Sequence, residues 1–95
     1  MRIRSVRHKG LRRLLEEDDN RGLPSNLVKR IRNILAVLLA ASDMDGVVGP
    51  PGWRIHQLSG KRAGTWTISV SGNWRLTFDV KDGEIYNLNL EDYHS

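Results

Sequence analysis

One arginine and three residues near the C-terminus have the types and positions that could bind or process an anion. Arg75 alternates with apolar residues in the segment 73–80. Because side chains alternate between the two faces of a strand, Arg75 should point away from the core, onto an open face. Asp92, Tyr93 and His94 would lie at the edge of that face. A guanidinium presents a planar fork to two phosphate oxygens, so the arrangement is a candidate anion site that suits the phosphate of RNA. A solubilising arginine and a frayed tail remain open as simpler interpretations.

The positive charge of the chain is concentrated at its N-terminal end. The 95 residues include 15 Lys and Arg against 11 Asp and Glu, a formal charge of +4. Such clustering favours a polyanionic partner, either nucleic acid or an acidic protein, over a basic surface that is merely solvated. Six basic residues lie in the first thirteen positions, with no acid among them: Arg2, Arg4, Arg7, Lys9, Arg12 and Arg13.

Composition and spacing argue against several other kinds of protein. There is no cysteine, and the 3 histidines are scattered, so we predict no metal site and no cofactor. The pair Gly60-Lys61 lacks the upstream glycine and the following Ser or Thr of a phosphate-binding loop. The N-terminus is charged where a signal peptide would be apolar, and the longest apolar run, residues 34–41, is much shorter than a membrane span. We therefore expect a soluble, cytoplasmic protein with no membrane partner.

Two helices are predicted in the first half of the chain. Three leucines between residues 11 and 15 recur at i, i+3 and i+4, which predicts a helix that begins at about His8 or Lys9. The run of acids at 16–19 opposes the helix dipole and should loosen the end of this helix. After a breaker at 21–24, a second helix should run from Pro24 or Ser25 to about Ser42, and the pair forms an αα-hairpin. The buried stripe of the second helix is predicted to be Leu27, Ile31, Ile34, Leu35 and Leu38.

A change of period from 3.6 to 2 after Gly52 predicts four strands, near residues 53–58, 65–71, 73–80 and 84–90. On the last strand, Tyr86, Leu88 and Leu90 share one parity, while Asn87, Asn89 and Glu91 share the polar one. With a short strand between Ile3 and Val6, the fold class is α+β in a single domain over residues 1–95. We predict the order β-α-α-β-β-β-β, with the N-terminal strand and the αα-hairpin packed on one face of a mostly antiparallel sheet.

Several segments of the chain resemble a known family in the same order and at similar spacing. The specific pair is Asn73-Trp74-Arg75 with the ending Glu91-Asp92-Tyr93-His94, and residues 3–11, 50–60 and 62–70 add to it. Together they resemble the HigB-type killer toxins of the RelE/ParE superfamily. The resemblance implies a RelE-like fold and a ribosome-dependent endoribonuclease that cuts mRNA in the decoding site.

The resemblance also implies roles for particular residues. Cleavage would need no metal: a ribose 2′-hydroxyl attacks the neighbouring phosphate, which requires a base, an acid and cations. His94 and Asp92 would be the acid–base candidates, Tyr93 would stack on or hydrogen-bond the nucleotide, and Arg75 would stabilise charge on the phosphate. Which of the three C-terminal residues is base and which is acid stays open. Ser59 replaces a Lys that is common in the family, so either Lys61 or Arg62 would supply that cation, and Arg62 is counted among the catalytic residues. RNA contacts are predicted at Lys61, His56, Arg54, Arg7, Lys9 and Arg12.

The implied partners are a cognate helix-turn-helix antitoxin of the HigA type, the ribosome and mRNA. Operator DNA would be contacted only indirectly, through the antitoxin. The N-terminal basic residues could meet ribosomal RNA or an acidic antitoxin surface, and charge alone does not separate these. Two other functions remain open: a non-catalytic growth inhibitor, as in the gyrase-poisoning branch of the superfamily, and an RNA-binding module without cleavage.

Overall fold

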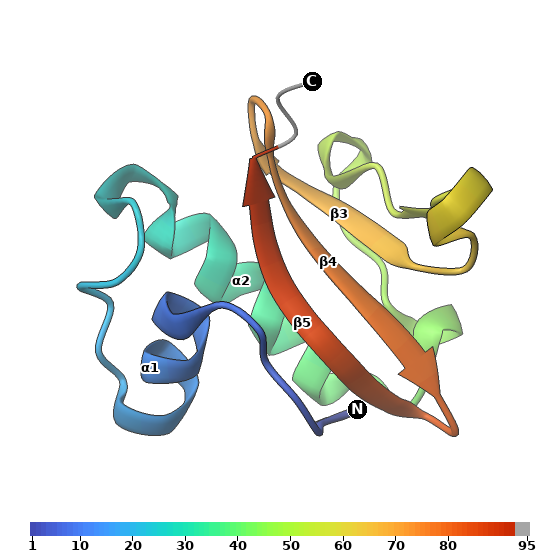
Figure 1. The fold of residues 1–95 in the computed structure, drawn as a ribbon, viewed down its shortest axis with the longest axis horizontal. Helices are drawn as coiled ribbons and strands as arrows, with labels where there is room; N and C mark the ends of the chain where they lie inside the picture. The colour runs from blue at the N-terminus through green and yellow to red at the C-terminus, as the bar shows by residue number, and fades with distance from the viewer. Residues whose placement is uncertain (93–95) are drawn as a thin grey trace.

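The structure, a computed structural model that describes residues 1–92, is built on one mixed β-sheet. Its strand order is β1-β5-β4-β3-β2, with β1 parallel to β5 and the other neighbours antiparallel. Helices α1 (Lys9–Glu17) and α2 (Val28–Ala40) pack against one side of the sheet (Figure 1). This is the α+β arrangement and the element order that the sequence predicted. The strands are β1 (Arg2–Ile3), β2 (His56–Gln57), β3 (Trp66–Ser71), β4 (Trp74–Lys81) and β5 (Glu84–Asp92).

Helix α1 begins with a histidine cap and ends at a left-handed residue. The Nδ1 atom of His8 accepts hydrogen bonds from the backbone N–H groups of Gly10 (3.0 Å) and Leu11 (3.3 Å), which would otherwise lack partners. Asp18, at φ 54°, ends the helix where the acidic run was predicted to loosen it. A Cβ atom on Gly10 would lie 2.2 Å from the carbonyl oxygen of Gly22. The glycine therefore allows the chain between the helices to pass close to α1.

Helix α2 supplies one wall of the hydrophobic core. The helix was predicted to begin at Pro24 or Ser25, but that stretch forms a 3-10 turn at Ser25–Leu27 and the α-helix begins at Val28. All five residues of the predicted stripe are buried, and they belong to the same core cluster as the sheet residues Ile68, Leu76 and Phe78. Burial of each such side chain stabilises the fold by roughly 1.5–3 kcal/mol. Neither helix in residues 1–92 is long and apolar enough to cross a membrane.

Strand β5 contains a bulge that the sequence pattern did not predict. Thr77 pairs with Asn89 and Asp79 pairs with Tyr86, so β5 uses one residue more than β4 between these pairs. Asn87 absorbs the extra residue in a left-handed conformation (φ 57°). The bulge reverses the parity, so that Ile85 is fully buried and Tyr86 shares the face of Asp79. The prediction that Tyr86 has the parity of Leu88 and Leu90 is therefore wrong.

The strand predicted at 53–58 is much shorter in the structure. Pro51–Trp53 forms a 3-10 turn, and Arg54 follows in a left-handed conformation (φ 48°), so only His56–Gln57 pairs with β3. At the other edge of the sheet, β1 covers Arg2–Ile3, and pairing continues only as a single bridge from Val6 to Leu88.

Candidate functional site

The face of the sheet away from the helices, here called the outer face, carries polar side chains in cross-strand rows. Directly opposed residues in neighbouring strands point to the same side of a sheet. Arg75 has the parity that the sequence predicted, opposite to Leu76 and Phe78 of the core. The rows are Ser69–Arg75–Glu91, then His56–Thr67–Thr77–Asn89, then Asp79–Tyr86.

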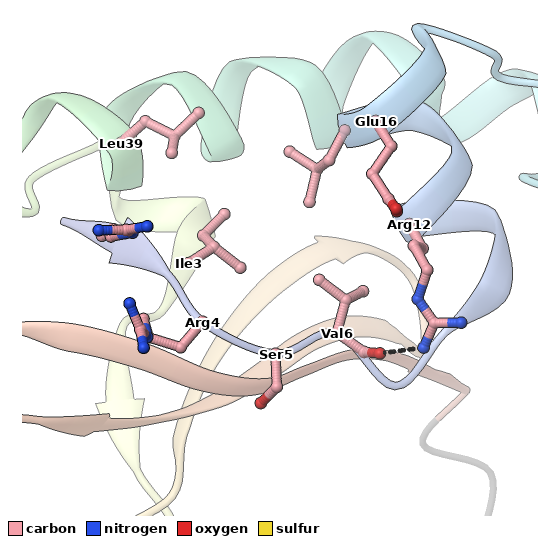
Figure 2. A pocket seen from close by; sticks show the side chains of 9 residues that line it. Ile3, Arg4, Ser5, Val6, Arg12, Glu16 and Leu39 are labelled. Atoms are coloured by element: carbon pink, nitrogen blue, oxygen red, sulfur yellow. Dashed lines mark hydrogen bonds between the residues drawn. The ribbon is translucent and has the colours of Figure 1, made fainter.

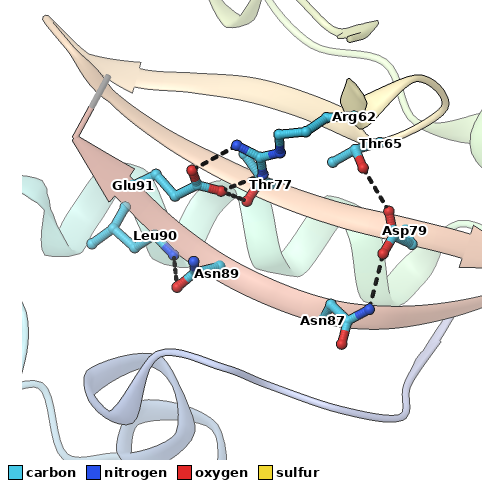
Figure 3. Close-up of polar contacts among 8 residues, drawn as sticks. All are labelled: Arg62, Thr65, Thr77, Asp79, Asn87, Asn89, Leu90 and Glu91. Atoms are coloured by element: carbon cyan, nitrogen blue, oxygen red, sulfur yellow. Dashed lines mark hydrogen bonds and ion pairs between the residues drawn. The ribbon is translucent and has the colours of Figure 1, made fainter. Parts of the chain in front are cut away.

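A two-point ion pair joins Arg62 to Glu91 across the outer face. The Nη1 and Nη2 atoms of Arg62 lie 2.9 Å and 2.6 Å from the two carboxylate oxygens of Glu91 (Figure 3). The Thr77 hydroxyl donates a further hydrogen bond to Oε2 of the same carboxylate. These hydrogen bonds, first from Arg62 and then from Thr77, lower the pKa of Glu91, and the positive charges of Arg62 and Arg7 add to the effect.

Three arginines surround this carboxylate and are called the arginine cluster: Arg7, Arg62 and Arg75. Arg75 is the cross-strand neighbour of Glu91. Arg7 lies on the segment that runs beside β5, where its backbone N–H donates to the carbonyl of Leu88 (2.8 Å). Among the residues that the structure describes, this cluster brings three positive charges to the single carboxylate of Glu91, which favours binding of a phosphate group at this end of the outer face.

The loop between β2 and β3 carries Arg62 to this position. Its base is closed by hydrogen bonds from Leu58 N–H to the Thr65 carbonyl (2.8 Å) and from Gly64 N–H to the Leu58 carbonyl (3.3 Å). Gly64, at φ 93°, adopts a conformation that other residues rarely take. Within the loop, the 3-10 turn η4 (Gly60–Arg62) contains both loop cations, Lys61 and Arg62.

A second polar network ties the opposite end of the outer face together. The carboxylate of Asp79 accepts hydrogen bonds from the Thr65 hydroxyl (2.8 Å) and from the side-chain amide of Asn87 (2.9 Å) (Figure 3). The network therefore links the end of the loop at 58–65, strand β4 and the bulge of β5. It connects the segment that carries Arg62 to the sheet.

The structure places the other predicted RNA contacts at two locations. His56 is an exposed residue of β2, and its Nδ1–H donates to the carbonyl of the exposed Arg54 (2.6 Å), which leaves Nε2 as the acceptor of the ring. Arg12 lies instead in a groove of about 630 Å³ between the segment 2–6 and the helices, where its Nη2 atom donates to the Val6 carbonyl (2.6 Å) (Figure 2). Lys9 is exposed at the first residue of α1.

The C-terminal residues of the predicted site are only partly described. Asp92, the exposed last residue of β5, is in register with Trp74 and so has the opposite parity to Glu91. Tyr93 and His94 lie outside the described residues. In residues 1–92 no group of three or more His, Asp or Glu side chains could hold a metal ion.

Sequence reasoning did not single out Glu91 and Thr77 as members of the site. Both share the parity of Arg75, and Glu91 was placed on the polar side of its strand. Nothing in the sequence indicated that Arg62 binds Glu91, because the two residues are 29 positions apart and Arg62 lies on a loop without a periodic pattern.

Solved structures from E. coli share the fold of this chain. YafQ from E. coli matches with a TM-score of 0.64 and 13% identity, over 97% of this chain and 93% of that chain. A chain of the E. coli DinJ–YafQ toxin–antitoxin complex matches with a TM-score of 0.61 and 13% identity, over 96% of this chain and 90% of that chain. At this identity the likeness shows the fold alone: the chain has the α+β architecture of YafQ.

The family follows from sequence comparison. A family model described as the RelE-like toxin of the type II toxin–antitoxin system HigB matches residues 4–94. Endoribonuclease HigB of Proteus vulgaris is 40% identical over 92 residues, which cover 97% of this chain and 99% of that protein. The chain therefore belongs to the HigB-like family of RelE-like toxins of type II toxin–antitoxin systems, and the resemblance noted in the sequence is confirmed.

Proposed function

We propose that this toxin is a ribosome-dependent endoribonuclease that cleaves mRNA in the decoding site. The endoribonuclease activity is supported by the identity to HigB of Proteus vulgaris along nearly the whole chain. The observation that carries the proposal is the arginine cluster on the outer face, beside the end of β5, where Asp92 begins the Asp-Tyr-His ending. The ribosome dependence and the site of cleavage follow from the family resemblance.

In the proposed reaction, the ribose 2′-oxygen attacks the neighbouring phosphate. A bond forms between the 2′-oxygen and phosphorus, the bond from phosphorus to the 5′-oxygen breaks, and the products are a 2′,3′-cyclic phosphate and a 5′-hydroxyl. A base takes the proton of the 2′-hydroxyl, and an acid gives a proton to the leaving 5′-oxygen. The guanidinium groups of Arg75 and Arg62 stabilise the negative charge that accumulates on the phosphate oxygens. We propose that these cations take the place of a metal ion.

The remaining predicted residues have supporting roles in this proposal. Asp92 and His94 transfer the protons, with the order of base and acid left to experiment, and Tyr93 contacts the nucleotide. Because Asp92 has the opposite parity to Glu91, it would reach the phosphate from the end of β5 and not from the outer face itself. Arg54, His56 and Lys61, which lie on or beside β2 and its loop, contact nucleotides next to the cleaved bond, as does Arg7. Lys9 and Arg12 lie on the helical side of the segment 2–6, and they contact nucleotides farther from the cleaved bond.

We further propose that a HigA-like helix-turn-helix antitoxin neutralises the toxin. The toxin would contact operator DNA only indirectly, through this antitoxin. The family assignment supports an antitoxin partner. Since mRNA and ribosomes are the proposed targets, we infer that the protein acts in the cytoplasm.

The test is primer extension on a defined mRNA after brief induction of the wild type, Arg75→Ala, His94→Ala and Lys29→Ala. Lys29 is an exposed cation on α2, away from the outer face, and serves as the charge-matched control. We expect cuts within the translated region in the wild type and in Lys29→Ala, and a loss of about 100-fold or more in the two site variants. Folded site variants that cut like the wild type would show that the site is wrong. Intact transcripts with accumulating DNA breaks would instead identify a gyrase poison.

A further inference from the structure

We propose that Glu91 is a positioning residue that, together with Thr77, holds Arg62 over the outer face and so makes Arg62, rather than Lys61, the loop cation of the site. The inference rests on the proposed function for the role of Arg62 in cleavage. It adds a function for Glu91 and Thr77, and it decides between two neighbouring cations.

The contact between Arg62 and Glu91 restrains both ends of the guanidinium. Nη1 and Nη2 each contact a different carboxylate oxygen, at 2.9 Å and 2.6 Å, so the plane of the guanidinium is fixed as well as its position. The side chain of Arg62 is 48% exposed and leaves a surface loop, where a long side chain would otherwise sample many rotamers. A lysine cannot form this two-point contact, because its ammonium group is a single point charge.

The carboxylate that holds Arg62 is itself fixed by a buried group. Thr77 is 4% exposed, and its hydroxyl donates to Oε2 of Glu91, the oxygen that also faces Nη2 of Arg62. Thr77 lies two residues from Arg75 on the same face of β4. The chain of contacts therefore runs from the loop through β5 to β4 (Figure 3). It relates the position of Arg62 to that of Arg75, which lies on the same strand as Thr77.

Glu91 has other conceivable roles, and they predict different outcomes. A carboxylate that only repelled RNA would raise the cleavage rate when removed, because a negative charge opposes phosphate binding. A carboxylate that transferred the proton would change the pH profile of cleavage when replaced by an amide. A positioning residue should instead show its effect through Arg62 alone.

The experiment is a double-mutant cycle on single-turnover cleavage by purified toxin on ribosomes programmed with a defined mRNA. We expect Arg62→Ala to reduce the rate about 100-fold and Glu91→Ala to reduce it between about 10-fold and 100-fold. The double variant should be no slower than Arg62→Ala, since Glu91 has nothing left to position. Lys29→Ala, which removes an exposed cation from α2, is the control and should stay within about threefold of the wild type. Lys61→Ala removes a nucleotide contact and should reduce the rate clearly less than Arg62→Ala does.

Two conservative variants refine the cycle. Glu91→Gln keeps one oxygen acceptor and should retain more activity than Glu91→Ala, with an unchanged pH profile. Glu91→Asp keeps the charge but is one methylene shorter, so it should not rescue cleavage. Effects that multiply in the double variant, a rate above that of the wild type, or a shifted pH profile in Glu91→Gln would each overturn the proposal.

A second readout does not depend on cleavage. In ¹⁵N-labelled toxin, the side-chain Nε–H signal of Arg62, assigned by its loss in Arg62→Ala, should be resolved in the wild type and broadened by exchange in Glu91→Ala. Thermal unfolding checks that each variant is folded. If Arg62 is immobilised in the wild type but the wild type does not cut RNA, the proposed function is refuted and the positioning role of Glu91 is not. An Nε–H signal that is unchanged in folded Glu91→Ala would refute the positioning role.

Discussion

The imidazole of His8 makes the start of α1 sensitive to pH. Its Nδ1 accepts hydrogen bonds from two backbone N–H groups, and burial lowers the pKa of His8. A protonated ring cannot accept these bonds, so the unfolded state binds the proton more readily than the folded state. The stabilisation is complete above the usual value of about 6.5 and is lost as the pH falls through the lower folded pKa. We expect the unfolding temperature of the wild type to drop relative to that of His8→Asn when the pH is lowered from about 7.5 to 5.

Asparagine is the informative replacement for His8 because its side chain caps a helix at every pH in this range. His56→Asn is the matched control, since it removes an exposed imidazole from β2. Circular dichroism melts of the three proteins should show the pH-dependent difference for His8 only. A difference between wild type and His8→Asn that stays constant over the whole range would refute the role of the cap.

At the scale of the element, the bulge in β5 decides which side chains reach the core. Ile85 is fully buried, while Tyr86 lies on the outer face beside Asp79. We expect Ile85→Ala to reduce the free energy of unfolding by about 2–5 kcal/mol, because it leaves a cavity in the core. Tyr86→Ala should reduce it by about 1 kcal/mol or less. Urea denaturation followed by tryptophan fluorescence measures both values.

These two neighbouring residues are controls for one another, since a regular strand would reverse the order of the effects. The pattern of Tyr86, Leu88 and Leu90 predicts a buried Tyr86 if β5 has no bulge. A larger loss of stability for Tyr86→Ala than for Ile85→Ala would therefore show that the register is wrong.

At the scale of the whole molecule, the two sides of the sheet differ in what they offer a polyanion. The outer face carries the arginine cluster, and the helices cover the opposite face (Figure 1). We expect binding of the toxin to purified ribosomes to weaken as salt is raised. Arg7→Ala should reduce the slope of log affinity against log salt by about 1, because Arg7 lies beside Glu91 in the cluster.

Lys29→Ala removes the same charge from the helical side of the molecule. If RNA meets the outer face, this variant should bind with the affinity and salt slope of the wild type. Equal effects of the two substitutions would indicate that only net charge matters, and the outer face would lose its assignment as the RNA-binding surface.

Local patterns were sufficient for the two helices, the order of the elements along the chain and the parity of Arg75. The apolar stripe of α2 and the alternation of β4 depend on residues that are only a few positions apart. Such a pattern determines which face of a helix or strand is buried in the core. The specific pair formed by Asn73-Trp74-Arg75 and the C-terminal ending was also sufficient to indicate the family. These features would be the same whatever the details of the packing.

The register of β5 and the partner of Arg62 were decided only by the tertiary structure. An alternating pattern does not indicate where a β-bulge inserts an unpaired residue. The left-handed conformation of Asn87 and the outward orientation of Tyr86 could therefore not be predicted. Likewise, Glu91 meets Arg62 only because the tertiary structure brings the loop at 58–65 within reach of β5. Contacts between segments far apart in the chain depend on how the strands align, and the energy that selects this alignment comes from the packed core as a whole.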